Sequence, residues 1–314
     1  MTQTIEQHTR VPETSAGVRL DQAAAELFPD FSRSRLQAWI KAGALRVNGA
    51  AARPRDKLLG GEALSLCAQL QQQGDWEAQD MALDVVYEDA ELLVVNKPAN
   101  LVVHPAAGNR SGTLLNALLH RVPALTELPR AGIVHRLDKD TTGLMVVAKS
   151  LPAHTSLVAQ LQARSVSREY EAVVQGALTG GGNVEAPIGR HPKQRKKMAV
   201  VAGGKAAVTH YRVLERFAGH THVRLRLETG RTHQIRVHMA HIGYPLVGDA
   251  TYGGRLRLPK QASAVLTECL RDFPRQALHA AGLGLQHPAS GELLHWRAPR
   301  PDDFERLLAV LHSG

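Results

Sequence analysis

The sequence has few cysteines and few aromatic residues. Cys67 and Cys269 are the two cysteines of the 314-residue chain, and two distant thiols cannot supply a four-thiolate zinc site. Aromatic residues make up 4% of the chain. This scarcity argues against a platform of stacked rings for binding single-stranded nucleic acid.

The sequence also lacks a long hydrophobic run. No stretch of eighteen consecutive apolar residues occurs, so we expect no transmembrane helix and no membrane partner. Residues 1–17 are polar and mixed in charge, without the apolar core of a secretory signal. We therefore expect a flexible N-terminal tail on a protein of the cytoplasm.

Basic residues, in contrast, are in excess. The formal net charge is +9 and the sequence pI is about 9.8, which favours a polyanionic partner, most often nucleic acid. Residues 190–198 form the densest basic run, in a loop bounded by glycine and proline. We predict that this loop grips phosphates, although such runs are commonly just solvated.

Residues 18–68 form a first block of elements. Within it, residues 31–43 predict a short helix that Ser32 or Ser34 can cap and Gly43 can end in a left-handed turn. The apolar face of this helix consists of Leu36, Trp39 and Ile40. The opposite face carries three cations that we expect to face phosphates: Arg33, Arg35 and Lys41.

A polar linker at residues 69–80 separates this block from a domain at residues 81–314. In the second domain, strands are predicted at residues 83–87, 92–96, 143–148, 170–174 and 223–228. Helices are predicted at residues 113–120, 154–163, 232–241 and 302–311. This order favours an α/β or α+β domain built on a mixed sheet.

Two polar loops carry candidate catalytic residues. Asp138 and Asp140 lie in a loop just before an apolar strand, where catalytic carboxylates are often held, although Asp in a loop also commonly caps turns. Arg231 lies in a second loop, between the strand 223–228 and a helix that Thr232 can cap. Its guanidinium can pair with a carboxylate of another loop, or it can be a surface or phosphate-contacting arginine.

Histidines near Arg231 do not predict a metal site. His233, His238 and His241 are spaced by five and three residues, which spreads them around a helix of 3.6 residues per turn. A zinc-binding pair normally lies at positions i and i+4 and needs a further ligand. We therefore predict no metal.

Four segments, in order and spacing, resemble the motifs of the RluA-type pseudouridine synthases. The segments are residues 89–98 with 103–105, His135-Arg136-Leu137-Asp138 with 142–144, residues 168–172, and residues 227–238 running on to 253. The resemblance covers about residues 83–311. Residues 18–66 resemble an S4 RNA-binding domain.

The resemblance implies an α+β protein, in which a small S4 domain precedes a mixed, mostly antiparallel sheet flanked by helices. Such enzymes isomerise uridine in RNA and need no cofactor or metal. Three catalytic residues are implied by motif position: Asp138 as the carboxylate, Tyr170 against the target base, and Arg231 in a salt bridge with the aspartate. Two further residues would bind substrate: Ile235 in the base pocket and Arg136 in the space left by the flipped base.

The S4 domain favours ribosomal RNA as the substrate. By resemblance we expect a monomer that acts on 23S rRNA or an assembling large subunit, at uridines in the loop of helix 69. Three alternatives remain: a transfer-RNA-directed synthase, a non-catalytic S4-type RNA-binding protein, and a carboxylate-dependent hydrolase in which Asp140 assists.

Overall fold

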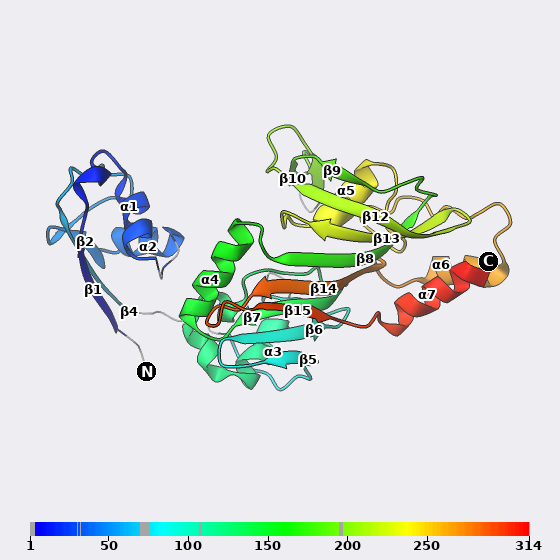
Figure 1. Ribbon diagram of the computed structural model, residues 1–314, viewed down its shortest axis with the longest axis horizontal. Coiled ribbons are helices and arrows are strands. Elements are labelled where there is room, and N and C mark those ends of the chain that lie inside the picture. Colours follow the sequence, from blue (N-terminus) through cyan, green and yellow to red (C-terminus); the bar gives the residue numbers. More distant parts are fainter. Residues whose placement is uncertain are drawn as a thin grey trace. The chain divides into compact units, whose positions relative to one another are not determined.

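Two compact units make up the computed structural model of the chain (Figure 1). The structure describes residues 4–29, 31, 33–69, 76–106, 109–194 and 197–313. The chain divides near residue 75, inside the range 69–80 that the sequence suggested as a linker, of which residues 70–75 lie outside the described residues. We call the parts before and after this point the N-terminal unit and the C-terminal unit.

The N-terminal unit contains a four-stranded antiparallel sheet and two helices. The strand order is β1 (Thr4–Arg10), β4 (Ala63–Gln69), β2 (Leu45–Val47) and β3 (Ala50–Ala51). The helices are α1 (Leu20–Leu27) and α2 (Arg33–Lys41). Both helices and the sheet bury leucine or isoleucine side chains, including Leu20, Leu36, Ile40, Leu45, Leu64 and Leu66.

Helix α2 confirms most of the predicted helix at residues 31–43. Leu36 and Ile40 are buried, whereas Trp39 is half-buried and packs edge-on against Phe31, with ring centroids 4.9 Å apart. Gly43 ends the helix with a φ of +73°, a conformation that glycine adopts without steric cost. The predicted caps cannot be assessed, because Ser32 and the side chain of Ser34 lie outside the described residues.

The prediction of a flexible tail at residues 1–17 was wrong for residues 4–10. These residues form β1, which pairs antiparallel with β4 from Thr4 opposite Gln69 to Arg10 opposite Ala63. No hydrophobic pattern in the sequence indicates this strand, because none of the side chains from 5 to 10 is buried. Backbone hydrogen bonds, rather than a buried face, hold the strand in the sheet.

A buried carboxylate, Asp21, organises one face of the N-terminal unit. Its side chain is fully buried and accepts hydrogen bonds from Arg19 at 2.9 and 3.0 Å and from Arg33 at 2.9 and 3.2 Å. Gln37 donates a further hydrogen bond to it. The expectation that Arg33 is free to face phosphates was therefore wrong, because its guanidinium is committed to Asp21.

The other two residues predicted to contact RNA, Arg35 and Lys41, differ from Arg33 in their surroundings. Arg35 is half-buried, with its guanidinium carbon 5.7 Å from the centre of the Trp39 ring. Lys41 is exposed at the last turn of α2. Lys41 is thus more exposed than Arg35.

We predict that Asp21 makes the stability of the N-terminal unit depend on acid pH. Burial raises the pKa of this carboxyl, but the hydrogen bonds from Arg19, Gln37 and Arg33 outweigh burial and lower the pKa from 3.8 to about 2. The carboxylate therefore stabilises the folded state above about pH 4, and this contribution disappears as the pH falls towards 2. Asp21→Asn should lower the melting temperature at pH 7 and converge with the parent chain near pH 2 in calorimetry. Glu26→Gln, at an exposed position of α1, is the control; a deficit of Asp21→Asn that is constant across this range would contradict the prediction.

The C-terminal unit is built on a nine-stranded sheet. Its strand order is β5 (Val85–Glu88), β6 (Leu92–Lys97), β7 (Thr142–Ala148), β14 (Leu278–Gln286), β8 (Ser167–Gln175), β13 (His220–Leu227), β12 (Val208–Phe217) and β9 (Gly182–Glu185), with β15 (Leu293–Arg297) also paired to β14. Neighbouring strands are antiparallel except β7 and β14, which are parallel. The predicted mixed, mostly antiparallel sheet of an α+β fold is confirmed.

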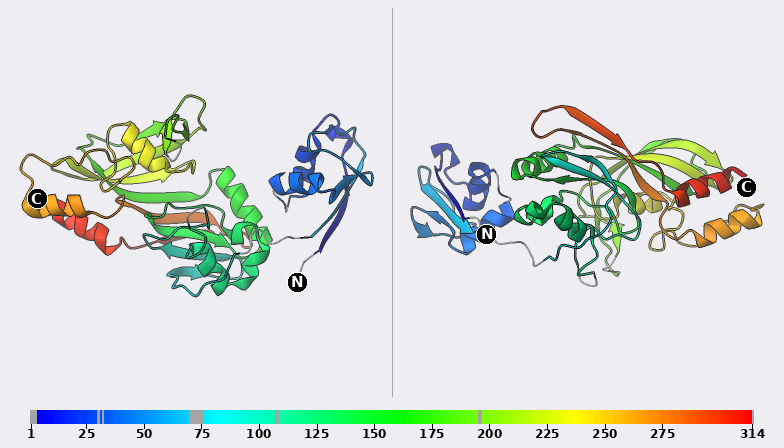
Figure 2. Two further views of the ribbon diagram at one scale, coloured as in Figure 1. Left: turned by 180° about the vertical axis from the view of Figure 1, so that it is seen from behind. Right: turned by 90° about the horizontal axis from the view of Figure 1, so that it is seen from below.

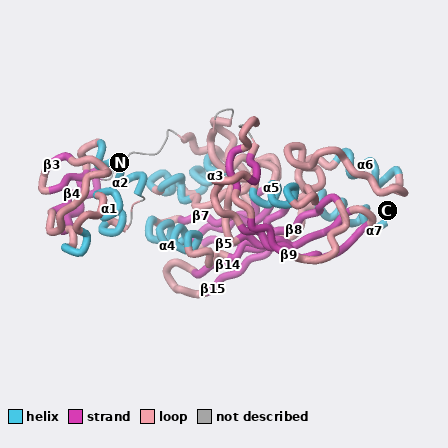
Figure 3. Tube along the Cα trace, turned by 90° about the horizontal axis from the view of Figure 1, so that it is seen from above, coloured by secondary structure: helices cyan, strands magenta, loops and turns pink. Residues whose placement is uncertain are grey.

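Helices flank this sheet, as the tube in Figure 3 shows. They are α3 (Leu114–Arg121), α4 (Leu151–Gln162), α5 (Gln234–His241), α6 (Ala264–Asp272) and α7 (Asp302–Ser313). Helices α6 and α7 lie side by side (Figure 2) and share a core that includes Leu266 and Phe304. No helix among the described residues is long and apolar enough to cross a membrane.

A separate hairpin carries the basic run of the sequence. It consists of β10 (Ile188–Arg190) and β11 (Met198–Val200), which pair antiparallel. The loop between them holds residues 191–197, of which 195 and 196 lie outside the described residues. The run is thus placed at the tip of a hairpin.

Gly143 allows the two parallel strands to meet directly behind the loop of Asp138. It has a φ of +112°, and a Cβ at this position would lie 2.2 Å from the backbone oxygen of Ala280 in β14. A side chain would therefore push β7 and β14 apart. The short sequence Thr142-Gly143 thus fixes where the Asp138 loop joins the sheet.

Candidate active site

The loop at residues 135–141 carries Asp138 and is anchored at both of its ends. At the start, the Nε2 atom of His135 accepts a hydrogen bond of 3.1 Å from the Val146 amide of β7. At the end, the Thr141 hydroxyl accepts a hydrogen bond of 3.0 Å from the Gln276 side chain. Burial, helped by the charge of Arg168, lowers the pKa of His135 to about 3, so its imidazole stays neutral and keeps the lone pair that accepts this bond.

Lys97 holds the middle of the same loop. Its side chain is 1% exposed, and its Nζ donates to the backbone oxygens of Pro98, Leu101 and Lys139 at 2.6, 3.0 and 2.9 Å. Burial lowers the pKa of Lys97 to about 7, against the opposing effect of Asp140 and Asp138. Three carbonyl acceptors match the three N–H groups of an ammonium ion, so Lys97 fixes the residue that follows Asp138.

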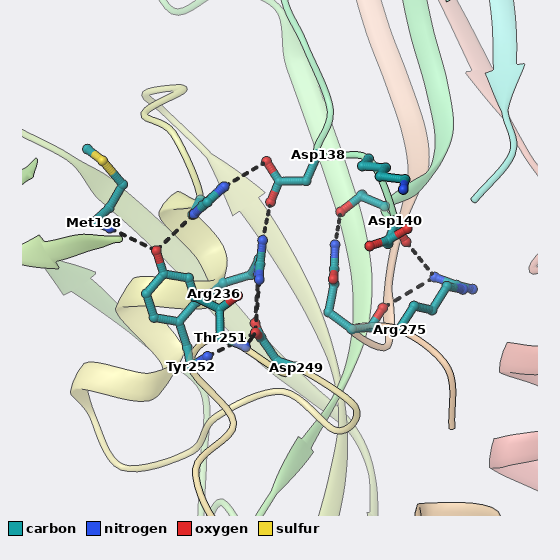
Figure 4. Close-up of polar contacts among 12 residues, drawn as sticks. Asp138, Asp140, Met198, Arg236, Asp249, Thr251, Tyr252 and Arg275 are labelled. Carbon is teal, nitrogen blue, oxygen red and sulfur yellow. Dashed lines mark hydrogen bonds and ion pairs between the residues drawn. The ribbon is translucent and has the colours of Figure 1, made fainter. Parts of the chain in front are cut away.

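Arg236 joins Asp138 to a second, fully buried carboxylate. The guanidinium donates to Asp138 Oδ2 at 2.9 Å and to both oxygens of Asp249 at 2.7 and 2.9 Å (Figure 4). Burial lowers the pKa of Arg236, but Asp249 and Asp138 raise it well above its ordinary value, so the guanidinium remains charged. Asp249 also accepts hydrogen bonds from the amides of Thr251 and Tyr252. One cation thus connects the loop before β7, helix α5 and the turn at 249–252.

The prediction that Arg231 pairs with Asp138 was wrong. The Nε atom of Arg231 donates to the backbone oxygen of Ala206 at 3.1 Å, and its amide donates to the Gln234 side chain. The predicted cap Thr232 also differs, because α5 begins after His233, which has a left-handed φ of +56°. Side chains in the first turn of a helix point back towards its N-terminus, and this orientation lets Arg236 reach the Asp138 loop.

A cavity of about 620 Å³ opens beside Asp138, within the range of roughly 300–1,000 Å³ typical of small-ligand sites. It brings together five residues that the sequence singled out: Asp138, Tyr170, Arg136, Ile235 and Arg231. The other three predicted contacts, Arg33, Arg35 and Lys41, belong to the N-terminal unit and do not line it. Several cations share the lining, including Arg130, Arg164 and Arg168, so the cavity suits an anionic ligand.

Comparison with known proteins identifies a family model for each of the two units. The family model for RNA pseudouridylate synthase matches residues 91–241, and the S4 domain model matches residues 18–64. The chain is 64% identical to "Ribosomal large subunit pseudouridine synthase D" of Pseudomonas aeruginosa, over 100% of this chain and 98% of that protein. Its identity to the protein of the same name in Escherichia coli strain K12 is 56%, over 100% of this chain and 96% of that protein. This chain belongs to the RNA pseudouridylate synthase family.

Solved structures agree with this membership. "Human RNA Pseudouridylate Synthase Domain Containing 4" is 28% identical, with a TM-score of 0.58 over 73% of this chain and 93% of that one. "Human RNA Pseudouridylate Synthase Domain Containing 1" has the same identity and a TM-score of 0.56. The resemblance that the sequence motifs indicated is confirmed, and the chain is an isomerase with an N-terminal S4 domain.

Tyr170 and Ile235 form buried parts of the synthase cavity. Tyr170 lies on β8 and is 6% exposed, and Ile235 lies in the first turn of α5 and is 4% exposed. Burial raises the pKa of Tyr170, with Arg168 opposing and Asp138 adding to this effect. The phenol therefore keeps its proton at neutral pH and can act as a hydrogen-bond donor. Arg136, in contrast, is exposed.

Sequence reasoning missed four residues of this synthase site: Lys97, Arg236, Asp249 and Tyr252. Lys97, Arg236 and Asp249 are buried charges, and a buried charge must be paired or hydrogen-bonded. Arg236 and Asp249 stood within the motif segments, but the sequence does not reveal which arginine and which carboxylates meet. The centre of the Tyr252 ring lies 5.1 Å from the guanidinium carbon of Arg236, a contact between a turn and helix α5 that no local pattern signals.

We predict that Arg236, not Arg231, is indispensable for turnover. Arg236→Lys keeps the charge but cannot bond Asp249 through two nitrogens and Asp138 through a third. Misplacement of the carboxylate should then lower the single-turnover rate of pseudouridine formation about 100-fold. Arg231→Ala should leave this rate within about tenfold of the parent enzyme, because its side chain does not hold Asp138. The reverse order of the two defects would restore Arg231 as the partner of the aspartate.

Proposed function

We propose that this enzyme converts uridine to pseudouridine in large-subunit (23S) ribosomal RNA, with Asp138 as the catalytic carboxylate. The observation that carries the proposal is a carboxylate beside an open cavity, held by a buried arginine whose own anchor is a second carboxylate. The names of its close relatives support ribosomal RNA as the substrate. We expect the loop of helix 69 to contain the target uridines and the enzyme to act as a cytoplasmic monomer.

The reaction rearranges bonds without oxidation or hydrolysis. The bond between N1 of the base and C1′ of the ribose breaks, the base turns, C5 bonds to C1′, and a proton leaves C5 while N1 gains one. The Asp138 carboxylate either attacks C1′ or removes a proton on the way to a glycal, and both routes require the ionised form. Arg236 holds Oδ2, which leaves Oδ1 to face the ribose.

The walls of the cavity fit a flipped uracil. Ile235 supplies an apolar wall and the Tyr170 ring a flat surface on which the base can pack. Flipping costs a few kcal/mol of lost stacking and pairing. Exposed Arg136 at the cavity is suited to fill the space that the base leaves in the RNA. Arg231, which does not hold Asp138, is suited to a phosphate near the target.

We predict that Asp138→Asn abolishes the modification and leaves RNA binding intact. Asparagine has nearly the same volume but lacks the negative charge that either route requires. In cells without the parent protein, pseudouridines should be absent from the helix 69 loop of 23S rRNA, and Asp138→Asn should not restore them. The purified variant should bind the RNA with parental affinity. Activity within about tenfold of the parent would reject Asp138 as the catalytic carboxylate, whereas loss of pseudouridine from transfer RNA alone would reject the proposed substrate.

We also propose that α2 of the S4 domain contacts RNA phosphates through Arg35 and Lys41. Such contacts position the RNA without reading its sequence, and each one adds to the salt dependence of binding. Arg33 is left unchanged in the test, because its loss would unpair Asp21.

The double change Arg35→Gln with Lys41→Gln should flatten the slope of log K against log salt by up to about 2. Turnover at saturating RNA should be unaffected, because the site lies in the other unit. The double change Arg55→Gln with Lys57→Gln, at two exposed positions of the same unit outside α2, provides the charge-matched control. An unchanged slope in the double variant would assign the phosphate contacts to the loop of the β10–β11 hairpin instead.

A further inference from the structure

Asp138 has a second polar neighbour besides Arg236. The Nε2 atom of His233 lies 3.8 Å from Asp138 Oδ1, and the imidazole lines the cavity. We propose that His233, held in its Nε2–H form by the hydroxyl of Tyr252, is a positioning residue that orients the free oxygen of Asp138 during uridine isomerisation. The inference rests on the proposed function and extends it to a residue pair outside the aspartate, tyrosine and arginine set.

The backbone at His233 is built to aim its side chain. His233 has φ +56° and ψ +23°, a left-handed conformation that is strained for a non-glycine residue. It is nevertheless the N-cap of α5, with its backbone oxygen accepting the Val237 amide. The side chain makes no capping hydrogen bond. No side-chain cap offsets the strain at His233. The strained backbone therefore indicates that the imidazole must point in one direction.

Hydrogen bonding favours the tautomer of His233 that carries its proton on Nε2. The Tyr252 hydroxyl oxygen accepts a bond of 2.9 Å from the Met198 amide and lies 2.8 Å from His233 Nδ1 (Figure 4 shows Tyr252, Met198 and Asp138). Within the part of the chain that the structure describes, Nδ1 is the acceptor in reach of the hydroxyl proton. The neutral imidazole then carries its own proton on Nε2, which faces Oδ1. The other tautomer would turn a lone pair towards the carboxylate.

Burial favours the neutral form of this imidazole. Burial lowers the pKa of His233 below its ordinary 6.5, Arg236 and Arg136 lower it further, and Asp138 and Asp249 act in the opposite direction. A neutral N–H group can orient Oδ1 without forming an ion pair. An imidazolium would instead compete with the ribose for the carboxylate, since charge-assisted bonds are about twice as strong as neutral ones.

One short turn supports both partners of Asp138. Asp249 holds Arg236, which holds Oδ2, and Tyr252 holds His233, which faces Oδ1. The turn is also tied to the basic hairpin, because Lys197 donates to the Thr251 carbonyl oxygen and Met198 to the Tyr252 hydroxyl. The Asp138 carboxylate is thereby positioned from two sides by residues 249–252.

Two amide variants separate this role from simple packing. In His233→Gln the side-chain amide nitrogen can take the place of Nε2, whereas in His233→Asn it can take only the place of Nδ1. With helix 69 RNA in single turnover, we expect His233→Asn to lower the rate about 10–100-fold. His233→Gln should recover most of this loss, and the apparent Kd for RNA should stay within about threefold in both. His241→Gln, an exposed position at the far end of α5, should match the parent enzyme.

The dependence of the rate on pH provides the second readout. The parent rate should fall on the acid side with an apparent pKa below 6.5, as His233 gains a proton, and His233→Gln should shift this fall to lower pH. Tyr252→Phe, which keeps the ring but frees Nδ1, should also lower the rate. If His233→Asn does not fold, Tyr252→Phe and His233→Gln decide the question alone.

Equal rates in parent, His233→Asn and Tyr252→Phe would overturn the inference, as would an acid limb that keeps the parent's apparent pKa in His233→Gln. Failure of the proposed function looks different. In that case the parent enzyme itself would form no pseudouridine in large-subunit RNA.

Discussion

The arrangement of the site depends on one buried guanidinium with two carboxylate partners. Arg236 contacts Asp138 and Asp249, so its single positive charge is shared and the three groups carry a net negative charge. Removing one member of such a buried set commonly costs 3–5 kcal/mol, because a charge is left without its partner. The pairing also ties three segments that are distant in sequence. The direction of Asp138 is therefore set by helix α5 and the turn after it, not by its own loop alone.

Support for the Asp138 loop extends to the end of the chain. Arg275, 4% exposed, donates to the Asp140 carbonyl oxygen at 3.3 Å (Figure 4). It also donates to both oxygens of Asp303 in α7. The terminal helix thus contributes an anion that holds an arginine, and this arginine holds the loop. Lys97, the last residue of β6, supports the loop in a similar way, because its Nζ donates to three backbone carbonyl oxygens. Backbone oxygens around the loop are satisfied by buried cations, which is the arrangement that buried polar groups require.

Elements with a local sequence pattern were predicted correctly, whereas contacts between residues that are distant in the sequence were not. Strand β13 alternates between buried and exposed side chains in its second half, and α2 repeats its apolar face at helical spacing, so both were predicted. Strand β14 was missed, because most of its side chains are buried and Gly282 and Gly284 interrupt it. The motif 227–238 located the site, but the start of α5 decides which arginine reaches Asp138. That start depends on the left-handed His233, which no local pattern reveals.

An isomerase of this kind must retain a detached base while the base turns, so rigid placement matters more than a strong acid or base. N1 leaves C1′ and C5 of the same base bonds to it, so any drift of the carboxylate or the base in between exposes the intermediate to water. The site fits this demand. Its wall residues Tyr170 and Ile235 belong to a strand and a helix, and the Asp138 loop is anchored through His135, Lys97 and Arg275. The cation Arg136 lines the cavity and is exposed, whereas the charges that position Asp138 are buried. Salt therefore weakens interactions of exposed charges with RNA, whereas it screens the interactions among the buried charges around Asp138 much less.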